Sequence, residues 1–78
     1  MLLDVRGETC PYPMKKAMEA MERLPQGEDL EVLVDHPPAV DTIRMAANRF
    51  KFAMNVEAAG SGEWRIRLRR RPAQEVMA

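Results

Sequence analysis

Two hydrophobic periods alternate in the first half of the chain. Leu3 and Val5 alternate with polar residues, which predicts a half-buried strand over residues 2–6. The apolar residues from Met14 to Leu24 then recur every three or four positions, a spacing typical of an amphipathic helix. A strand over residues 30–34 and a second amphipathic helix follow. The apolar face of this second helix is formed by Ala39, Val40, Ile43, Ala46, Ala47 and Phe50.

From residue 53 onward the hydrophobic period is two. Two alternating runs are separated by Gly60-Ser61-Gly62, which predicts a tight hairpin turn between two strands. The apolar residues of these runs are Met54, Val56, Ala58, Trp64, Ile66 and Leu68. The predicted order of elements is therefore βαβαββ.

Each predicted strand is apolar on one face only. A parallel sheet covered by helices on both faces has nearly continuous apolar strands instead. Both helices are therefore predicted to cover one face of a mixed sheet of about four strands, giving a two-layer α/β (α+β) sandwich. We expect Leu3, Val5, Leu30, Val32, Val34, Val56, Trp64, Ile66 and Leu68 to lie beneath the helices. The methionines at positions 14, 18, 21 and 45 are predicted to fill the core between them.

The length and composition predict a single small cytoplasmic domain. The chain has 78 residues, 46% hydrophobic and 31% charged, and no apolar run approaches the roughly 18 residues of a membrane span. One cysteine excludes an internal disulfide framework, and one cysteine with one histidine excludes the usual zinc sites. Glycine motifs for nucleotide phosphates are absent. We predict a domain over residues 1–71 with a flexible tail at 72–78, and no metal or cofactor.

Positive charge is concentrated near the end of the chain. Residues 1–64 carry 7 basic and 11 acidic side chains, whereas residues 65–78 carry 5 arginines and 1 glutamate. We call Arg65, Arg67, Arg69, Arg70 and Arg71 the arginine block. It is interpreted either as a solvated strand face, neutralised by Asp4, Glu31 and Glu57, or as a docking surface for a protein or nucleic acid. Because no aromatic stacking platform accompanies it, the first interpretation is favoured over nucleic-acid binding.

The sharpest candidate for chemistry is Cys10-Pro11-Tyr12-Pro13. Cys10 follows the first strand and the turn at Gly7, and is predicted to lie at the N-cap of the first helix or just before it. The positive end of the helix dipole favours a thiolate there, which is the nucleophilic form of cysteine. Pro11 and Pro13 suit a first helical turn, where a missing N–H costs no hydrogen bond. The alternative is a small buried residue that fills a gap.

Other polar residues are predicted to lie near this cysteine. Lys15 and Lys16 follow it by one to two helical turns and add positive charge. Asp35 and His36 end the second strand, and the carboxyl ends of parallel strands meet at one sheet edge. These two side chains are therefore candidates to approach the sulfur. The alternative for His36, a surface histidine before two prolines, is a simply polar residue with no role in the chemistry, and this alternative is favoured. A Cys–His hydrolase is the chemical alternative, although so short a chain has little room for a substrate cleft.

The segment Leu3-Asp4-Val5-Arg6-Gly7-Glu8-Thr9-Cys10-Pro11-Tyr12-Pro13 resembles the opening of the TusA/SirA-like family, LD-x-x-G-x-x-CPxP. The resemblance continues through Gly27-Glu28-Asp29-Leu30 and Val34-Asp35-His36-Pro37 and covers about residues 2–70. It implies a βαβαββ two-layer fold and a sulfur-carrier protein. In such a carrier the CPxP cysteine, Cys10 here, takes up persulfide sulfur from a donor sulfurtransferase and passes it to an acceptor protein.

The chain departs from the tRNA-thiolation members of that family. Their basic pair on the first helix corresponds here to Met18 and Glu19, and their Asp-Ile at the second helix corresponds to Thr42-Ile43. Its Asp-x-Pro-x-x-Val pattern at residues 35–40 more closely resembles less characterised members of the family, some of which accompany thiosulfate-uptake membrane proteins or selenium metabolism. A second interpretation is therefore an accessory sulfur acceptor for a thiosulfate transporter. A third is a non-catalytic regulatory or nucleic-acid-binding module that uses the arginine block.

Overall fold

The computed structural model describes residues 1–9 and 11–71. Along this part of the chain the elements are β1 (Leu2–Asp4), α1 (Tyr12–Arg23), β2 (Leu30–Val34), α2 (Pro37–Arg49), β3 (Phe52–Gly60) and β4 (Glu63–Arg70). The predicted order βαβαββ is confirmed. Cys10 and the predicted flexible tail at 72–78 lie outside the described residues.

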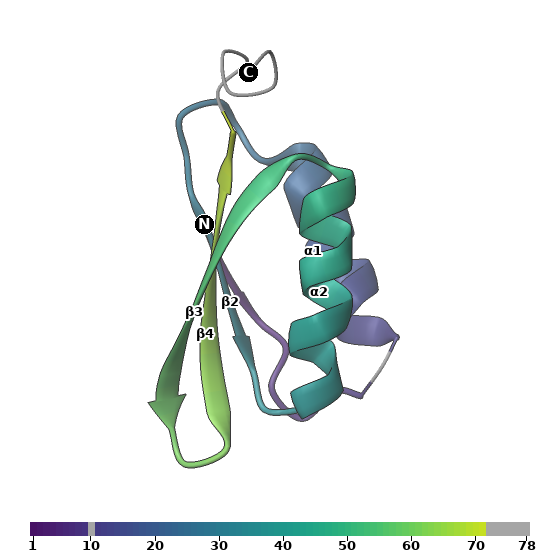
Figure 1. Cartoon of the computed structure of the whole chain (residues 1–78), viewed down its shortest axis with the longest axis vertical. Coiled ribbons are helices and arrows are strands. Elements are labelled where there is room, and N and C mark those ends of the chain that lie inside the picture. Colours follow the sequence, from purple (N-terminus) through teal and green to yellow (C-terminus); the bar gives the residue numbers. More distant parts are fainter. Residues whose placement is uncertain (10, 72–78) are drawn as a thin grey trace.

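The four strands form one mixed sheet in the order β1-β2-β4-β3. β1 is parallel to β2, and β4 is antiparallel to both β2 and β3. Both helices lie on one side of this sheet (Figure 1). The predicted two-layer arrangement is confirmed, and both helices begin at the sheet end where the parallel strands finish.

Prolines define where the helices begin and end. Pro11 is the N-cap of α1, one position earlier than the predicted first turn, whereas Pro13 lies inside that turn and is buried. α1 ends at Arg23, and its C-cap Leu24 has an extended ψ of 123° because the residue before a proline avoids the helical region. α2 starts at Pro37 after His36 as its N-cap. Neither described helix is long and apolar enough to cross a lipid bilayer.

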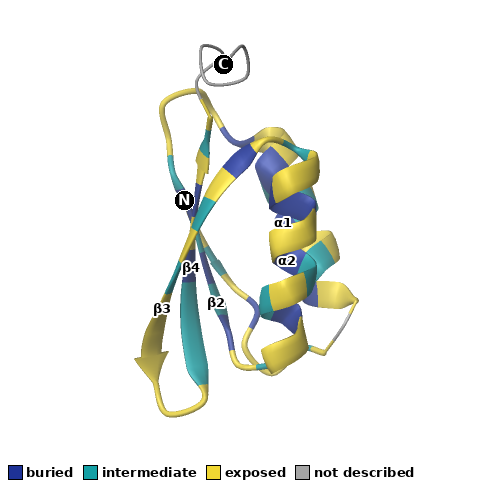
Figure 2. Cartoon of the chain, viewed as in Figure 1, coloured by how far each residue is buried: buried dark blue, intermediate teal, exposed yellow. Residues whose placement is uncertain are grey.

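The core lies between the sheet and the apolar stripes of the two helices (Figure 2). Six of the nine sheet residues expected there are fully buried, namely Val5, Leu30, Val32, Val34, Ile66 and Leu68. The other three, Leu3, Val56 and Trp64, are half-buried and pack against the core. The core prediction for Met45 is wrong, since its side chain is 70% exposed. Met45 lies two positions after the buried Ile43, which turns it about 200° around the helix.

The helix layer covers β3 less completely than the other long strands. On its helix-facing side Met54 and Val56 are half-buried and Ala58 is exposed. The hairpin that joins β3 to β4 extends past the ends of the helices (Figure 1). Its turn is formed by Ser61 and Gly62, with Gly62 at a φ of +72°.

Candidate functional site at the start of α1

The loop from β1 to α1 begins with a tight turn that requires glycine. The N–H of Val5 donates to Leu33 O at 3.0 Å, which extends the pairing with β2, and the N–H of Glu8 donates back to Val5 O at 3.2 Å. Gly7, the third residue of this four-residue turn, has a φ of +85°. Residues with a side chain rarely adopt that φ, so Gly7 sets the direction in which the chain leaves the sheet.

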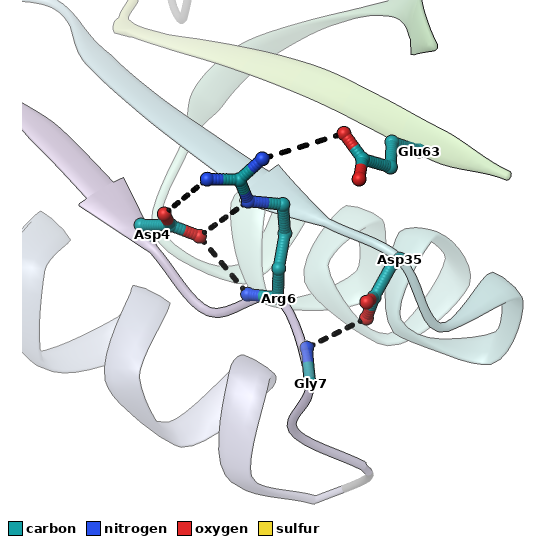
Figure 3. A network of polar contacts seen from close by, with 5 residues as sticks. All are labelled: Asp4, Arg6, Gly7, Asp35 and Glu63. Carbon is teal, nitrogen blue, oxygen red and sulfur yellow. Dashed lines mark hydrogen bonds and ion pairs between the residues drawn. The ribbon is translucent and has the colours of Figure 1, made fainter. Parts of the chain in front are cut away.

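A carboxylate from the neighbouring strand holds the same turn. Asp35 Oδ1 accepts a hydrogen bond of 2.9 Å from the N–H of Gly7 (Figure 3). The loops after β1 and β2 are therefore joined, as expected for the carboxyl ends of two parallel strands. The adjacent His36 is half-buried, and its C=O accepts a bond of 2.9 Å from Ala39 N–H. The approach of Asp35 and His36 to the sulfur stays a prediction, because Cys10 lies outside the described residues.

The two lysines of the prediction have different surroundings. Lys16 Nζ lies 2.6 Å from Glu8 Oε2, so this ion pair connects α1 back to the loop. Lys15 is exposed and makes no ion pair with another described residue. Because the Glu8 carboxylate offsets the charge of Lys16, Lys15 is the less compensated cation of the two.

The residues on either side of Cys10 in the sequence are accessible. The N–H of Tyr12 donates to Thr9 O at 3.1 Å. Thr9 and Pro11 are exposed, and Tyr12 is 57% exposed. Within the described residues, the first turn of α1 contains no acid and its N-cap supplies no side-chain hydrogen bond. No carboxylate of this first turn therefore offsets the positive end of the helix dipole.

Arg6 connects this loop to Glu63 at the start of β4. Its Nε and Nη2 donate to the two carboxylate oxygens of Asp4 at 2.9 and 2.7 Å, and its Nη1 lies 3.4 Å from Glu63 Oε1 (Figure 3). These bonds lower the pKa of Asp4 to about 2 and raise the pKa of Arg6. This cluster was not predicted from the sequence, although opposite charges at positions i and i+2 of a strand lie on one face.

The arginine block is divided between the two faces of the sheet. On the open face Arg67 Nε lies 3.2 Å from Glu31 Oε1, as predicted. Arg69 Nη2 lies 3.1 Å from Asp29 Oδ2, and this bond lowers the pKa of Asp29. Pairing of Asp29 with the arginine block was not predicted from the sequence. Asp4, which was expected to face the block, pairs with Arg6 instead.

The fourth arginine of the block has a structural role. Arg70 Nη2 donates to the C=O of Leu24 at 2.9 Å, beside the end of α1. Its guanidinium carbon lies 5.3 Å from the centre of the Phe52 ring. Arg70 thus binds a backbone carbonyl at the C-terminal end of α1, and the block does not form one continuous basic surface.

Comparison with known proteins decides the family. The family model described as Sulfurtransferase TusA matches residues 1–70. The chain belongs to this family. No cluster of three or more His, Cys, Asp or Glu side chains suited to a metal ion occurs in the described part of this TusA-family chain.

Relatives in this family are named, provisionally, as sulfur carrier proteins. One from Archaeoglobus fulgidus is 35% identical over 71 residues, which is 90% of this chain and 81% of the relative. YedF from Escherichia coli is 40% identical over 52 residues, covering 67% of this chain and 68% of the relative.

The fold also matches a solved structure. The crystal structure of a SirA-like protein from Desulfitobacterium hafniense superposes with a TM-score of 0.78, over 86% of this chain and 92% of that one. At 20% sequence identity this comparison establishes the fold alone.

Proposed function

We propose that this chain is a sulfur carrier that holds sulfane sulfur as a persulfide on Cys10 and passes it to a partner protein. The observation that carries the proposal is the CPxP segment at the start of α1, in a chain that belongs to the TusA family. The accessible residues Thr9, Pro11 and Tyr12 on either side of the cysteine support it, because a carrier must expose its cargo to two different proteins.

The transfer step is an exchange between a thiolate and a persulfide. The Cys10 thiolate attacks the outer sulfur of a donor persulfide, R–S–S⁻, and a new S–S bond forms as the donor S–S bond breaks. The donor leaves as a thiolate, R–S⁻, and Cys10 retains the anionic persulfide. Delivery repeats the exchange, with an acceptor thiolate attacking the outer sulfur and Cys10 leaving as the thiolate. No external oxidant or reductant is consumed.

The helix N-terminus suits both anions in this cycle. Thiolate and persulfide are negatively charged, and the positive end of the α1 dipole has no acid in its first turn. Pro11 and Pro13 have no N–H and the Tyr12 N–H is bonded to Thr9 O, so the proposed stabilisation comes from the dipole and from nearby cations. Lys15 adds positive charge, whereas Lys16 is already paired with Glu8. The field has to remain moderate, because the nucleophilicity of a thiolate falls as its pKa falls.

The partners proposed are a persulfide-bearing sulfurtransferase as donor and a sulfur-accepting protein, in the cytoplasm. A thiosulfate-transporting membrane protein is an alternative donor. The nucleic-acid-binding alternative receives less support, because Arg67 and Arg69 are paired with acids and Arg70 binds a helix terminus.

Intact-protein mass spectrometry tests the proposal. The reduced protein is incubated separately with a persulfidated sulfurtransferase and with thiosulfate, and one added sulfur atom at Cys10 is expected from at least one of them. Addition of a small thiol acceptor is expected to remove that sulfur again. A Cys10 that is alkylated readily by iodoacetamide but takes no sulfur from either donor overturns the proposal.

The matched control is Cys10→Ser. Serine favours a helix N-terminus at least as much as cysteine, so the variant is expected to fold with an unchanged circular dichroism spectrum. It is expected to take up no sulfur. An adduct that persists in Cys10→Ser places the sulfur on another group and contradicts the assignment.

A further inference from the structure

One edge of the sheet is formed by an unusually unprotected strand. β3 is an edge strand of 9 residues, and within the described chain it pairs on one side only, with β4. Natural edge strands are commonly protected by short length, lysine, proline or a bulge. Residues 52–58 contain neither lysine nor proline, and the bulge lies beyond them, between Ala58 and Gly60.

The backbone groups that face outward can be assigned from the ladder with β4. Hydrogen-bonded and non-hydrogen-bonded pairs alternate along an antiparallel ladder. The N–H of Arg71 donates to Lys51 O at 3.1 Å, one position before the pair Phe52–Arg70. The alternation therefore directs the backbone N–H and C=O groups of residues 53, 55 and 57 toward β4. The N–H and C=O groups that point to the free edge belong to Met54, Val56 and Ala58.

We propose that β3 pairs antiparallel with β3 of a second copy of this chain, with Val56 facing Val56 on the two-fold axis. This register sets Met54 opposite Ala58 and Asn55 opposite Glu57. The outward N–H and C=O groups of one copy then meet those of the other, and the two sheets become one continuous sheet.

The side chains of β3 favour a second copy over an unrelated strand. In this register the partly exposed Met54, Val56 and Ala58 of both copies lie together on the helix-covered face. On the open face Glu57, which is the one charged residue of β3, meets the amide of Asn55 rather than a like charge. With a single charge, β3 offers little to select a charged partner peptide.

The expected association is weak and leaves the candidate site free. A strand-to-strand contact covers less than the about 800 Å² per partner of a standard stable interface. β1, which leads into the loop before Cys10, lies at the opposite edge of the sheet from β3. Two carriers joined through β3 therefore both retain access to their partners.

Sedimentation equilibrium of the reduced protein, up to about 1 mM, tests the proposal. A reversible monomer–dimer equilibrium is expected, and Cys10→Ser is expected to show the same equilibrium, independent of sulfur chemistry. Val56→Pro removes an outward N–H while the bonds to β4 remain, so loss of the dimer is expected. A wild-type protein that stays monomeric at all concentrations overturns the proposal and leaves this edge to a strand of another protein.

Charge variants at Asn55 test the register without disturbing the core, because this side chain is exposed. Asn55→Lys places a cation opposite Glu57 of the second copy, and Asn55→Glu places an anion there. Asn55→Lys is expected to lower the dissociation constant of the dimer, and Asn55→Glu is expected to raise it. Each change is on the order of tenfold, because the dimer contains two symmetric pairs. Adding Glu57→Lys to Asn55→Glu is expected to restore association. Equal dissociation constants for the two single variants contradict this register.

Discussion

The carboxylate of Asp35 accepts a hydrogen bond of 2.9 Å from the backbone N–H of Gly7, which joins the loops that follow β1 and β2 (Figure 3). Gly7 precedes Cys10 by three positions, so this bond fixes the chain shortly before the proposed sulfur-carrying residue. Asp35 is therefore proposed to act as a positioning residue for the loop rather than to touch the sulfur.

Asp35→Ala is expected to loosen this loop. The lost hydrogen bond lowers the free energy of unfolding by about 0.5–1.5 kcal/mol, and the Gly7 amide exchanges with solvent faster. Asp35→Asn is expected to have the smaller effect, because its amide oxygen still accepts a bond. Urea denaturation and amide hydrogen exchange measure both effects. Unchanged protection of the Gly7 amide in Asp35→Ala contradicts the positioning role.

Gly7→Ala is expected to strain the backbone without any steric clash. An added Cβ at Gly7 meets no atom within 4 Å, so the cost comes from its φ of +85° alone. We expect a loss of about 1–2 kcal/mol in the free energy of unfolding. Gly60→Ala is the matched control, since its Cβ makes an ordinary contact of 3.7 Å with Glu63 Oε1. Thermal denaturation compares the two, and equal losses count against the strain at Gly7.

The sequence predicted the fold because each element carries its own period. Strict alternation in β4 separates the buried Ile66 from the exposed Arg67, and this one-sided pattern placed both helices on one face. Periodicity does not show how far the helix layer extends. Val56 and Trp64 lie on the helix-covered face, as predicted, but they are only half-buried, because the hairpin extends past the helices (Figure 1).

Ile66→Ala is expected to be strongly destabilising and Arg67→Ala nearly neutral. Ile66 is fully buried in the core, so its truncation leaves a cavity that costs about 2–5 kcal/mol. Arg67 lies on the open face with a side chain 52% exposed, and its ion pair with Glu31 contributes less than about 0.5 kcal/mol. Urea denaturation measures both variants, and comparable losses are incompatible with a one-sided sheet.

The pKa of Asp4 predicts a specific loss of stability in acid. Arg6 lowers the pKa of Asp4 from 3.8 to about 2, so the ionised carboxylate stabilises the folded state. This contribution is complete above the unfolded pKa and disappears as the pH falls through the folded value. Asp4→Asn is expected to be less stable than wild type at neutral pH, and this difference shrinks below pH 3.8 and vanishes below about pH 2.

Urea denaturation at a series of pH values measures this difference. Arg6→Gln removes the cause of the shift and is expected to reduce the acid dependence to the same extent as Asp4→Asn. A wild-type excess of stability that persists unchanged below the lowered pKa of Asp4 contradicts the assignment.

The candidate site was less predictable than the fold, because its contacts depend on where loops meet. Asp35 was correctly placed at the sheet edge that leads to α1, since the carboxyl ends of parallel strands coincide. The hydrogen bond from the Gly7 N–H to the Asp35 carboxylate depends on the geometry of the turn, which the sequence pattern does not give. The pairing of Lys16 with Glu8 likewise depends on the loop folding back along α1, and no helical or strand period contains that information.

The Glu8–Lys16 ion pair leads to a prediction about the reactivity of Cys10. Because Glu8 lies 2.6 Å from Lys16, the two charges largely cancel at a distance, whereas Lys15 has no described ion-pair partner. Lys15→Gln is therefore expected to raise the pKa of the Cys10 thiol more than Lys16→Gln does. Glu8→Gln is expected to lower that pKa, because it removes the anion and leaves the charge of Lys16 uncompensated.

The rate of iodoacetamide alkylation as a function of pH gives the thiol pKa of each variant. His36→Asn serves as the comparison and is expected to change the thiol pKa little, since helix position and lysine charge are proposed to supply the field. The order expected for the pKa is Lys15→Gln above Lys16→Gln, with Glu8→Gln below wild type. If His36→Asn produces the largest shift instead, the thiolate is activated by the imidazole. The carrier mechanism would then need a proton acceptor at the start of α2 in place of the electrostatic field at the start of α1.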